Sequence, residues 1–288
     1  MAASDEVGNK YKFKIFKNNI KGFEELYIWL GENIKTIHFC LEATGTYGEA
    51  LSYYLADKGL IVSVVNPAQI KGFSQSELSR NKTDKADSKL IARYCQAMNP
   101  PTWQPLPQHI LLLQSWVRRL KVLQSMYQEE RNRLEIALVP IQEDIQEDIQ
   151  EVTDLLAKKI NDIRKKIIVY IEKHPDLRGK KKLLETIPGI GEATIAQILS
   201  FMDTPERFKN AKQLVAFVGL NPKQNQSGSS VRGKTKLSKT GDAALRKALY
   251  MPAITAKKHN PIIKAFCQRL QKSGKPPLWL LYVRLCGN

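Results

Sequence analysis

Apolar residues between positions 141 and 171 recur at intervals of four, four and three, and this pattern constrains the fold more than any other. The residues are Ile141, Ile145, Ile149, Val152, Leu156, Ile160, Ile163, Ile167 and Ile171. Such spacing keeps the side chains on one nearly straight face of a long α-helix. A face this long must be buried against another helix, from the same chain or from a second subunit. We expect a second subunit.

A second helical segment precedes this one and reaches Pro140. Its apolar residues follow spacings of three and four: Leu113, Trp116, Leu120, Leu123, Tyr127 and Leu134. Proline is tolerated in the first turn of a helix, so Pro140 either kinks a helix or starts a new one. The two segments predict a long α-helical coiled-coil middle over residues 100–179, through which copies of the chain form a homo-oligomer.

The N-terminal part has a different pattern, in which short apolar runs alternate with amphipathic segments. Apolar runs at 36–42 and 60–66 flank a predicted helix over 48–57. Strand, helix and strand at this spacing form a βαβ unit, which implies a parallel sheet covered by helices. A further helix is predicted over 84–97. We therefore predict an α/β domain over residues 1–99.

The C-terminal part, residues 180–288, predicts a mainly α-helical domain. The segment 181–202 indicates two short helices joined by a turn with the sequence IPGIG, which is typical of a helix-hairpin-helix. The glycines Gly189 and Gly191 would let backbone N–H groups approach a phosphate at a helix N-terminus. The alternative is an ordinary corner between helices, where glycine only permits close packing.

The charge of the chain favours a polyanionic partner. The sequence has 45 Lys and Arg against 28 Asp and Glu, a formal net charge of +17. Such a surplus concentrates polyanions, most commonly nucleic acid. Nine basic residues and one acid, Asp242, lie between Lys223 and Lys258, so we expect phosphate contacts there. The candidate nucleic-acid-binding residues are Gly189, Gly191, Lys223, Arg232, Lys234, Lys236, Lys239 and Arg246.

Several other classes of protein are not expected. No apolar stretch is long enough to span a bilayer, and the polar start MAASDEVGNK has no signal-peptide core. The four cysteines lack C-x-x-C spacing, so neither a disulfide framework nor a structural zinc site is expected. We expect a cytoplasmic protein with no membrane partner.

One apparent nucleotide-binding motif is expected to be accidental. Residues 228–235, GSSVRGKT, formally match the Walker A expression. A P-loop leaves a strand directly and enters a helix directly, whereas here polar residues surround the match on both sides. The sequence also lacks G-x-S-x-G, so acyl-transfer hydrolysis has no support.

Three acids are candidates for a metal site. Glu42 ends a predicted buried strand, and Asp84 and Asp87 lie three residues apart at a helix start. Open parallel sheets place their sites at the carboxyl ends of strands. Three converging carboxylates would bind a hard divalent cation such as Mg²⁺, which promotes phosphodiester chemistry. The alternative is that acids in a first helical turn only complement the helix dipole.

The basic loop also contains the serines Ser227, Ser229 and Ser230. A serine hydroxyl that attacks a phosphodiester needs a positive field to stabilise the developing charge. The alternative is a phosphate-binding loop without chemistry.

Four segments in this order resemble the bacterial insertion-sequence transposases of family one hundred and ten, relatives of the Piv/MooV DNA invertases. The resemblance extends from about residue 8 to about residue 276. The segments are LEATGTYG (41–48), NKTDKADSKLIARY (81–94), IPGIGEATIAQILSFM (187–202) and GLNPKQNQSGSSVRGKTKLSKTGDAALRKALYM (219–251).

The resemblance implies a RuvC-like, RNase H-type domain with a DEDD set of carboxylates that hold Mg²⁺. It also implies a coiled-coil middle and a C-terminal transposase domain whose serine attacks DNA, with a guide RNA encoded by the element. By position Glu42 matches the second acid, and Asp84 and Asp87 match the third and fourth. Ser227, which precedes a glycine, matches the nucleophile, with Ser229 and Ser230 as alternatives.

The ends of the chain depart from the family pattern. Relatives begin with a GIDVS-type strand that carries the first acid, whereas DEVGNKYKFKIF here resembles the hairpin after it. The final PLWLLYVRLCGN also differs, so we expect a copy truncated at both ends and lacking the first strand. Two further functions stay open: an inactive remnant that binds DNA or RNA, and a RuvC-like nuclease in which Ser227 is dispensable.

Overall fold

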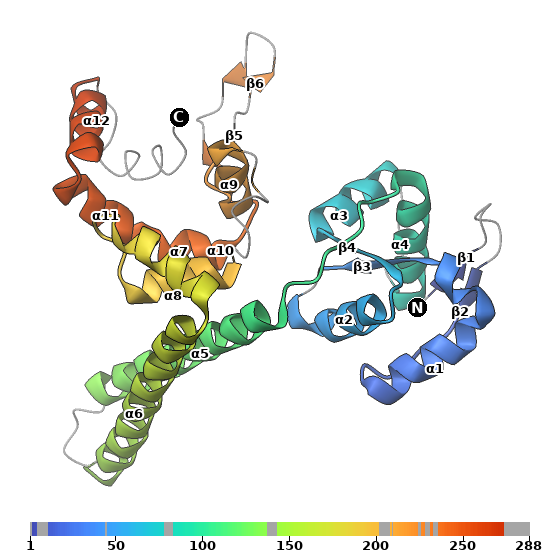
Figure 1. Ribbon diagram of the computed structural model, residues 1–288, viewed down its shortest axis with the longest axis horizontal. Helices are drawn as coiled ribbons and strands as arrows, with labels where there is room; N and C mark the ends of the chain where they lie inside the picture. Colours follow the sequence, from blue (N-terminus) through green and yellow to red (C-terminus); the bar gives the residue numbers. More distant parts are fainter. Residues whose placement is uncertain are drawn as a thin grey trace. The chain divides into compact units, whose positions relative to one another are not determined.

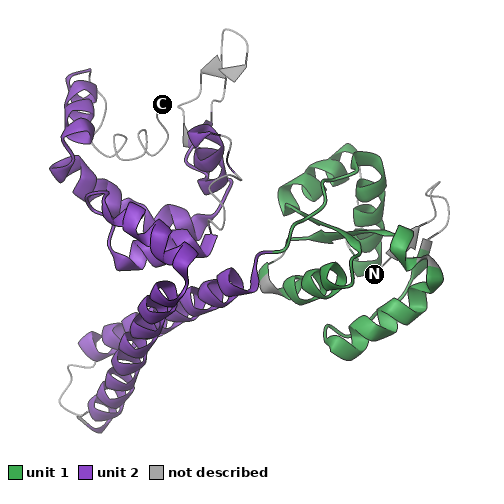
Figure 2. Cartoon of the chain, in the orientation of Figure 1, with its two compact units in different colours: residues 1–105 green, residues 106–288 purple. Residues whose placement is uncertain are grey.

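The computed structural model divides into two compact units, Met1–Pro105 and Leu106–Asn288 (Figure 2). It is mostly helical with a small parallel sheet (Figure 1). None of the helices in the described parts of the chain has the length and apolarity needed to cross a membrane. The described residues are 2–4, 11–43, 45–77, 83–136, 143–201, 208, 210–223, 226–227, 231–232 and 236–273.

The first unit is an α/β unit. A short antiparallel pair of strands comes first, followed by a helix and then by the strand–helix–strand segment that the sequence predicts. In chain order its elements are β1 (Ala2–Ser4), β2 (Tyr11–Phe13), α1 (Ile20–Leu30), η1 (Glu32–Thr36), β3 (His38–Glu42), η2 (Gly45–Tyr47), α2 (Glu49–Asp57), β4 (Ile61–Val65), α3 (Pro67–Ser76) and α4 (Asp84–Met98).

Strands β3 and β4 are parallel, and their register places Glu42 opposite Val65. Side chains alternate between the two faces of a strand, so each face has its own apolar contacts. Phe39 and Val62 pack with Leu55 on one face. On the other face Val65 packs with residues of α3 and α4. The predicted βαβ unit is confirmed, with helices against both faces of the sheet.

The proline-rich segment after α4 returns to the sheet. The Ser63 hydroxyl lies 3.0 Å from the Pro100 carbonyl oxygen and 2.8 Å from that of Pro101, and donates to them. The Trp103 N–H donates to the Val62 carbonyl at 2.7 Å, and the Trp103 ring lies 4.9 Å from that of Tyr53. These contacts place the segment beside β4 as part of the first unit.

The second unit is mainly helical, as the sequence predicts. Its helices are α5 (Gln108–Ile136), α6 (Glu143–Lys173), α7 (Pro175–Glu185), α8 (Glu192–Phe201), α9 (Ala211–Val218), α10 (Ala243–Ala248), α11 (Tyr250–His259) and α12 (Pro261–Lys272). Four two-residue strands lie between α9 and α10: β5 (Pro222–Lys223), β6 (Gln226–Ser227), β7 (Val231–Arg232) and β8 (Lys236–Leu237).

Helices α5 and α6 lie side by side and bury the apolar face of α6 (Figure 1). They run antiparallel, since the Tyr170 hydroxyl near the end of α6 donates to the His109 carbonyl at the start of α5. The contact residues are Ile110, Leu113, Val117, Leu120 and Leu123 of α5 and Leu156, Ile160, Ile163, Ile167 and Ile171 of α6. From Leu156 to Ile171 the expectation of a second subunit is therefore wrong, because α5 of the same chain covers this face.

Candidate functional site

Glu42 is the last residue of β3, on the strand face that packs against α4. Alternate strand residues share a face, so Glu42 lies on the same side as His38 and Cys40. Cys40 packs in the apolar cluster that contains Leu90 of α4. The Cys95 thiol of α4 donates to the His38 carbonyl, with sulfur and oxygen 3.9 Å apart. This face of β3 is therefore covered by α4.

Helix α4 runs antiparallel to β3, so its first turn lies toward the Glu42 end of the strand. Cys95 lies beside His38 at the start of the strand, whereas Ile91 packs in the cluster of Val65, which pairs with Glu42. From His38 to Glu42 the strand advances about 13 Å. From Cys95 back to Asp84 the helix spans about 16 Å and three turns, so both residues lie on the same side of α4. Glu42 and Asp84 therefore lie at the same end of the first unit.

The acids in the first turn of α4 differ in exposure. Asp84 is exposed, whereas Asp87 and Glu42 are half-buried. The Thr83 side chain caps the helix by accepting from the Ala86 N–H at 3.2 Å. Negative charge is favourable here because the first helical turn carries unpaired N–H groups.

The described residues contain no group of three or more His, Cys, Asp or Glu side chains that could hold a metal ion. The carboxylates Glu42, Asp84 and Asp87 do supply the oxygen donors that a hard cation prefers. In proteins Mg²⁺ is usually held by one or two carboxylates together with water and substrate phosphates. The donor chemistry therefore fits a divalent cation that takes its remaining ligands from water and from a bound phosphate group.

Two thiols join β3 to α4. The hydrogen bond between Cys40 and Cys95 raises the pKa of the Cys40 thiol, and burial raises it further. The same hydrogen bond lowers the pKa of Cys95, against the effect of burial. Both are free cysteines, and Cys40 stays protonated and is therefore a poor nucleophile.

We expect His38 to make the stability of the first unit depend on pH. Its Nε2 lies 2.7 Å from the Ser63 oxygen, which accepts a hydrogen bond from the imidazole N–H because the Ser63 hydroxyl itself donates to the proline carbonyls. Burial lowers the pKa of His38 below 6.5. A group whose pKa is lower in the folded than in the unfolded state stabilises the fold at pH values above its unfolded-state pKa. This stabilisation is lost as the pH falls through the folded-state pKa.

We expect the melting temperature to fall from about pH 7 to about pH 5 by more in the wild type than in His38→Gln. The glutamine amide can still donate to Ser63 but does not titrate. Circular dichroism at both pH values measures the difference, and equal falls in the two proteins would show that His38 is not responsible.

The predicted serine loop is a β-hairpin in its described parts. Strand β5 pairs antiparallel with β8, and β6 with β7, which places Lys223 opposite Lys236 and Ser227 opposite Val231. Ser229, Ser230 and Lys234 lie outside the described residues. Strand β8, rather than a helix, follows the Walker A match, so a P-loop has no structural support.

The hairpin is anchored where its two ends meet. Gly241 has a φ of 151°, and a Cβ atom there would lie 2.3 Å from the Phe217 carbonyl oxygen. The Asp242 N–H donates to that same oxygen at 2.9 Å, and the Asp242 side chain caps α10 by accepting from the Leu245 N–H. The helix cap and the close backbone approach hold the base of the hairpin against the end of α9.

The candidate cations of this region have different surroundings. Lys223 and Lys239 are exposed. The Arg246 guanidinium is half-buried and donates to the Val218 carbonyl at 2.8 Å, so it connects α10 to α9. Arg232 lies on β7 opposite Gln226, and Lys236 lies on β8 opposite Lys223.

The turn between α7 and α8 uses its two glycines differently. Gly189 has a φ of 97°, and a Cβ atom there would lie 2.9 Å from the Thr255 Cβ and 3.0 Å from the Pro252 carbonyl oxygen of α11. At Gly191 a Cβ atom would meet nothing within 4 Å. Gly189 thus permits close packing on α11, whereas Gly191 faces open space.

We expect Gly189→Ala to lower the free energy of unfolding by about 2 kcal/mol, because of its positive φ and the contact with Thr255. Gly191→Ala is the matched control and should change it little. Chemical denaturation followed by circular dichroism measures both. Equal effects of the two substitutions would rule out this packing role for Gly189.

Comparisons with known proteins relate both halves of the chain to transposases. Residues 1–143 match the family model DEDD_Tnp_IS110, described as a transposase, and residues 181–268 match the model of the transposase IS116/IS110/IS902 family. The chain is 33% identical over 271 residues to the pilin gene-inverting protein of Moraxella bovis, covering 93% of this chain and 83% of that protein.

Two further relatives extend this similarity. The pilin gene-inverting protein of Moraxella lacunata is 32% identical over the same shares of the two chains. An uncharacterized 43.6 kDa protein of the insertion element IS110 from Streptomyces coelicolor is 27% identical over 109 residues, which are 38% of this chain and 26% of that protein.

Proposed function

This chain belongs to the IS110 family of transposases, and on that premise we propose that it cuts and rejoins DNA with a serine nucleophile and Mg²⁺. The observation that carries the proposal is the similarity to a gene-inverting protein over 93% of the chain. Inverting a gene requires that DNA strands are broken and joined again. Both the acidic and the basic candidate groups lie within the matched length.

Ser227 is the proposed nucleophile. Its Oγ forms a bond to phosphorus while the bond from phosphorus to one strand oxygen breaks, and the leaving hydroxyl takes up a proton. Attack by a second strand's hydroxyl reverses the exchange and frees the serine. Each step replaces one phosphate ester by another, so no nucleoside triphosphate is needed. The accidental nature of the Walker A match agrees with this chemistry.

Glu42, Asp84 and Asp87 are the proposed cation ligands. When bound, Mg²⁺ supplies positive charge to the phosphate oxygens in the transition state. The carboxylates orient that charge, and the basic hairpin around Ser227 adds to the field at the phosphate through Lys223 and its neighbours.

The proposal includes DNA as partner and extends to a guide RNA encoded by the element. It assigns the turn around Gly191 to a helix-hairpin-helix contact with a phosphate, and the α5–α6 pair to a coiled coil in a homo-oligomer. It places the reaction in the cytoplasm, and assigns the first unit to a RuvC-like domain.

The purified chain, incubated with DNA carrying the ends of its element, the element RNA and Mg²⁺, tests the proposal. We expect recombinant DNA junctions, detected by amplification across the new joint. A chain that binds the DNA but forms no junction would instead be a DNA-binding protein without catalysis. That second function is favoured by one observation, the lack of a three-donor group among the described side chains.

A further inference from the structure

The α5–α6 pair is divided into a basic half and an acidic half. The proximal half comprises residues 108–124 of α5 and 157–173 of α6, and has nine Lys or Arg residues, three from α5 and six from α6, against two acids. The distal half comprises residues 125–136 and 143–156, and has nine acids, three from α5 and six from α6, against two arginines. The antiparallel pairing of the helices brings the like-charged segments together.

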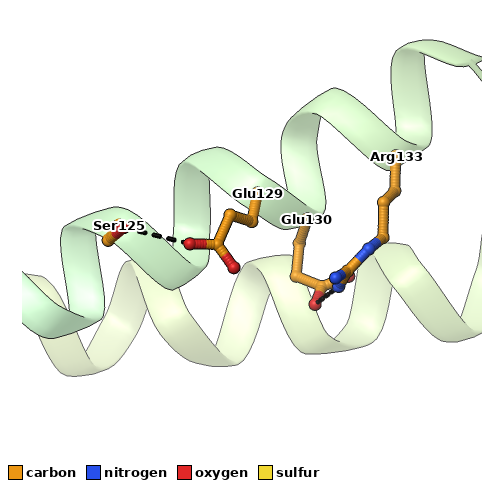
Figure 3. Close-up of polar contacts among 4 residues, drawn as sticks. All are labelled: Ser125, Glu129, Glu130 and Arg133. Carbon is orange, nitrogen blue, oxygen red and sulfur yellow. Dashed lines mark hydrogen bonds and ion pairs between the residues drawn. The ribbon is translucent and has the colours of Figure 1, made fainter.

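In the distal half the arginines are neutralised locally. Figure 3 shows Arg133 paired with Glu130 on α5, and Ser125 donating to Glu129 at 3.0 Å. Arg131 pairs with Glu135 at 3.6 Å. No unpaired positive charge is left there for a polyanion.

In the proximal half, seven exposed cations form no ion pair with any described residue, and four of them lie on one side of the helix pair. Lys159, Lys166 and Lys173 recur every seven residues along one side of α6. Seven residues are close to two helical turns, so the three lysines form a row about 21 Å long. The Lys166 Nζ lies 5.4 Å from the ring centroid of Trp116 on α5, and Arg119 lies one turn beyond Trp116 on the same side of α5.

This side of the helix pair is not the one that packs against α8. The Gln114 amide donates to the Ser200 carbonyl of α8 at 3.3 Å. Gln114 and Trp116 are two residues apart, about 200° around the helix, so α8 lies on the opposite side of α5 from the lysine row. The helix dipole does not account for the charge division either, since its effect is confined to the first and last turns.

We propose that this row of Arg119, Lys159, Lys166 and Lys173 binds the phosphate backbone of a nucleic-acid duplex. The inference rests on the proposed function and adds a second contact surface, separate from the 223–258 segment. A duplex carries about one negative charge per 1.7 Å of axis, so a straight row of 21 Å meets enough phosphates for every cation in it. The acidic distal half repels the same backbone and limits the contact to the proximal half.

The test uses the full chain with Lys159→Gln, Lys166→Gln and Lys173→Gln together. Glutamine keeps a similar helix propensity, and circular dichroism checks that the helices are retained. Affinity is measured against duplex DNA and duplex RNA of equal length and unrelated sequence, at several salt concentrations. The matched control is the triple variant Lys17→Gln, Lys21→Gln and Lys35→Gln, which removes the same charge from exposed positions of the first unit.

We expect the slope of log affinity against log salt to become shallower by about 2.7 units, and affinity at about 0.1 M salt to fall more than tenfold. A loss of affinity for duplex DNA, for duplex RNA or for both supports the inference and identifies which duplex the row binds. An unchanged slope, or an equal change in the control, would overturn it while the proposed function stands. A wild-type chain that binds neither duplex would overturn both.

Discussion

Ser227→Ala is expected to abolish the covalent link between the protein and DNA and to lower recombination by about 10³-fold or more. The substitution removes the only atom that can form the phosphoserine bond at this position, and loss of a nucleophile leaves only the contribution of binding and electrostatics. Binding to the DNA should be retained, because Ser227 is uncharged. The adduct is measured by electrophoresis of labelled DNA in denaturing detergent.

The neighbouring serines provide the control for this experiment. Ser229→Ala and Ser230→Ala remove the same hydroxyl group from the same segment and should leave the adduct in place. If the adduct persists in Ser227→Ala and is lost in one of the other two variants, the nucleophile has been assigned to the wrong serine. If it persists in all three, a serine of this hairpin is not the nucleophile.

Glu42→Gln is expected to abolish Mg²⁺-dependent cleavage and strand exchange while leaving DNA binding nearly unchanged. The amide has a similar shape but no charge, so it holds a divalent cation poorly. A metal ion contributes several kcal/mol to stabilising charge in the transition state, which corresponds to a loss of about 10³-fold. Junction formation across a range of Mg²⁺ concentrations measures the effect.

Glu24→Gln is the matched control, since Glu24 is an exposed acid on α1 in the same unit. It should leave cleavage unchanged. A Glu42→Gln chain that cuts DNA as fast as the control would remove Glu42 from the proposed cation ligands. Loss of DNA binding together with cleavage would instead point to a structural role for Glu42.

The βαβ segment of the first unit could be predicted from the sequence because its signals are local. Phe39 and Val62 fill one face of the sheet and Val65 the other, as short apolar runs flanking a helix lead one to expect. That Glu42 and the first turn of α4 lie at the same end of the unit follows from the same topology. The evidence for this placement is the contact of Cys95 with His38, which joins residues far apart in sequence and therefore leaves no sign in a local sequence pattern.

Three features of the second unit could not be predicted because they depend on residues far apart in sequence. Periodicity indicates that Ile160 and Ile167 lie on an apolar face, but it does not indicate which helix covers that face. The serine hairpin has little apolar alternation, and its base is fixed by the close approach of Gly241 to Phe217. Arg246 has the charge of a phosphate ligand, whereas its contact with the Val218 carbonyl is tertiary.

The three lysines of the cationic row could have been predicted from their spacing alone, independently of the net charge of the 223–258 segment. Lys159, Lys166 and Lys173 are separated by sevens, which puts them on one side of a helix wherever the helix lies. Whether such lysines are paired depends on the partner helix. Only the structure shows that neighbouring acids neutralise the arginines of the distal half, whereas these lysines form no ion pair with a described residue.

The most direct test is the yield of the covalent protein–DNA adduct in the Glu42→Gln chain, with the linked peptide identified by mapping. It measures whether formation of the bond between Ser227 of the second unit and DNA depends on Glu42 of the first unit. We predict that wild type with Mg²⁺ yields DNA linked to the peptide containing Ser227, and that Glu42→Gln yields none. An undiminished adduct at Ser227 in Glu42→Gln would contradict joint action on one phosphodiester.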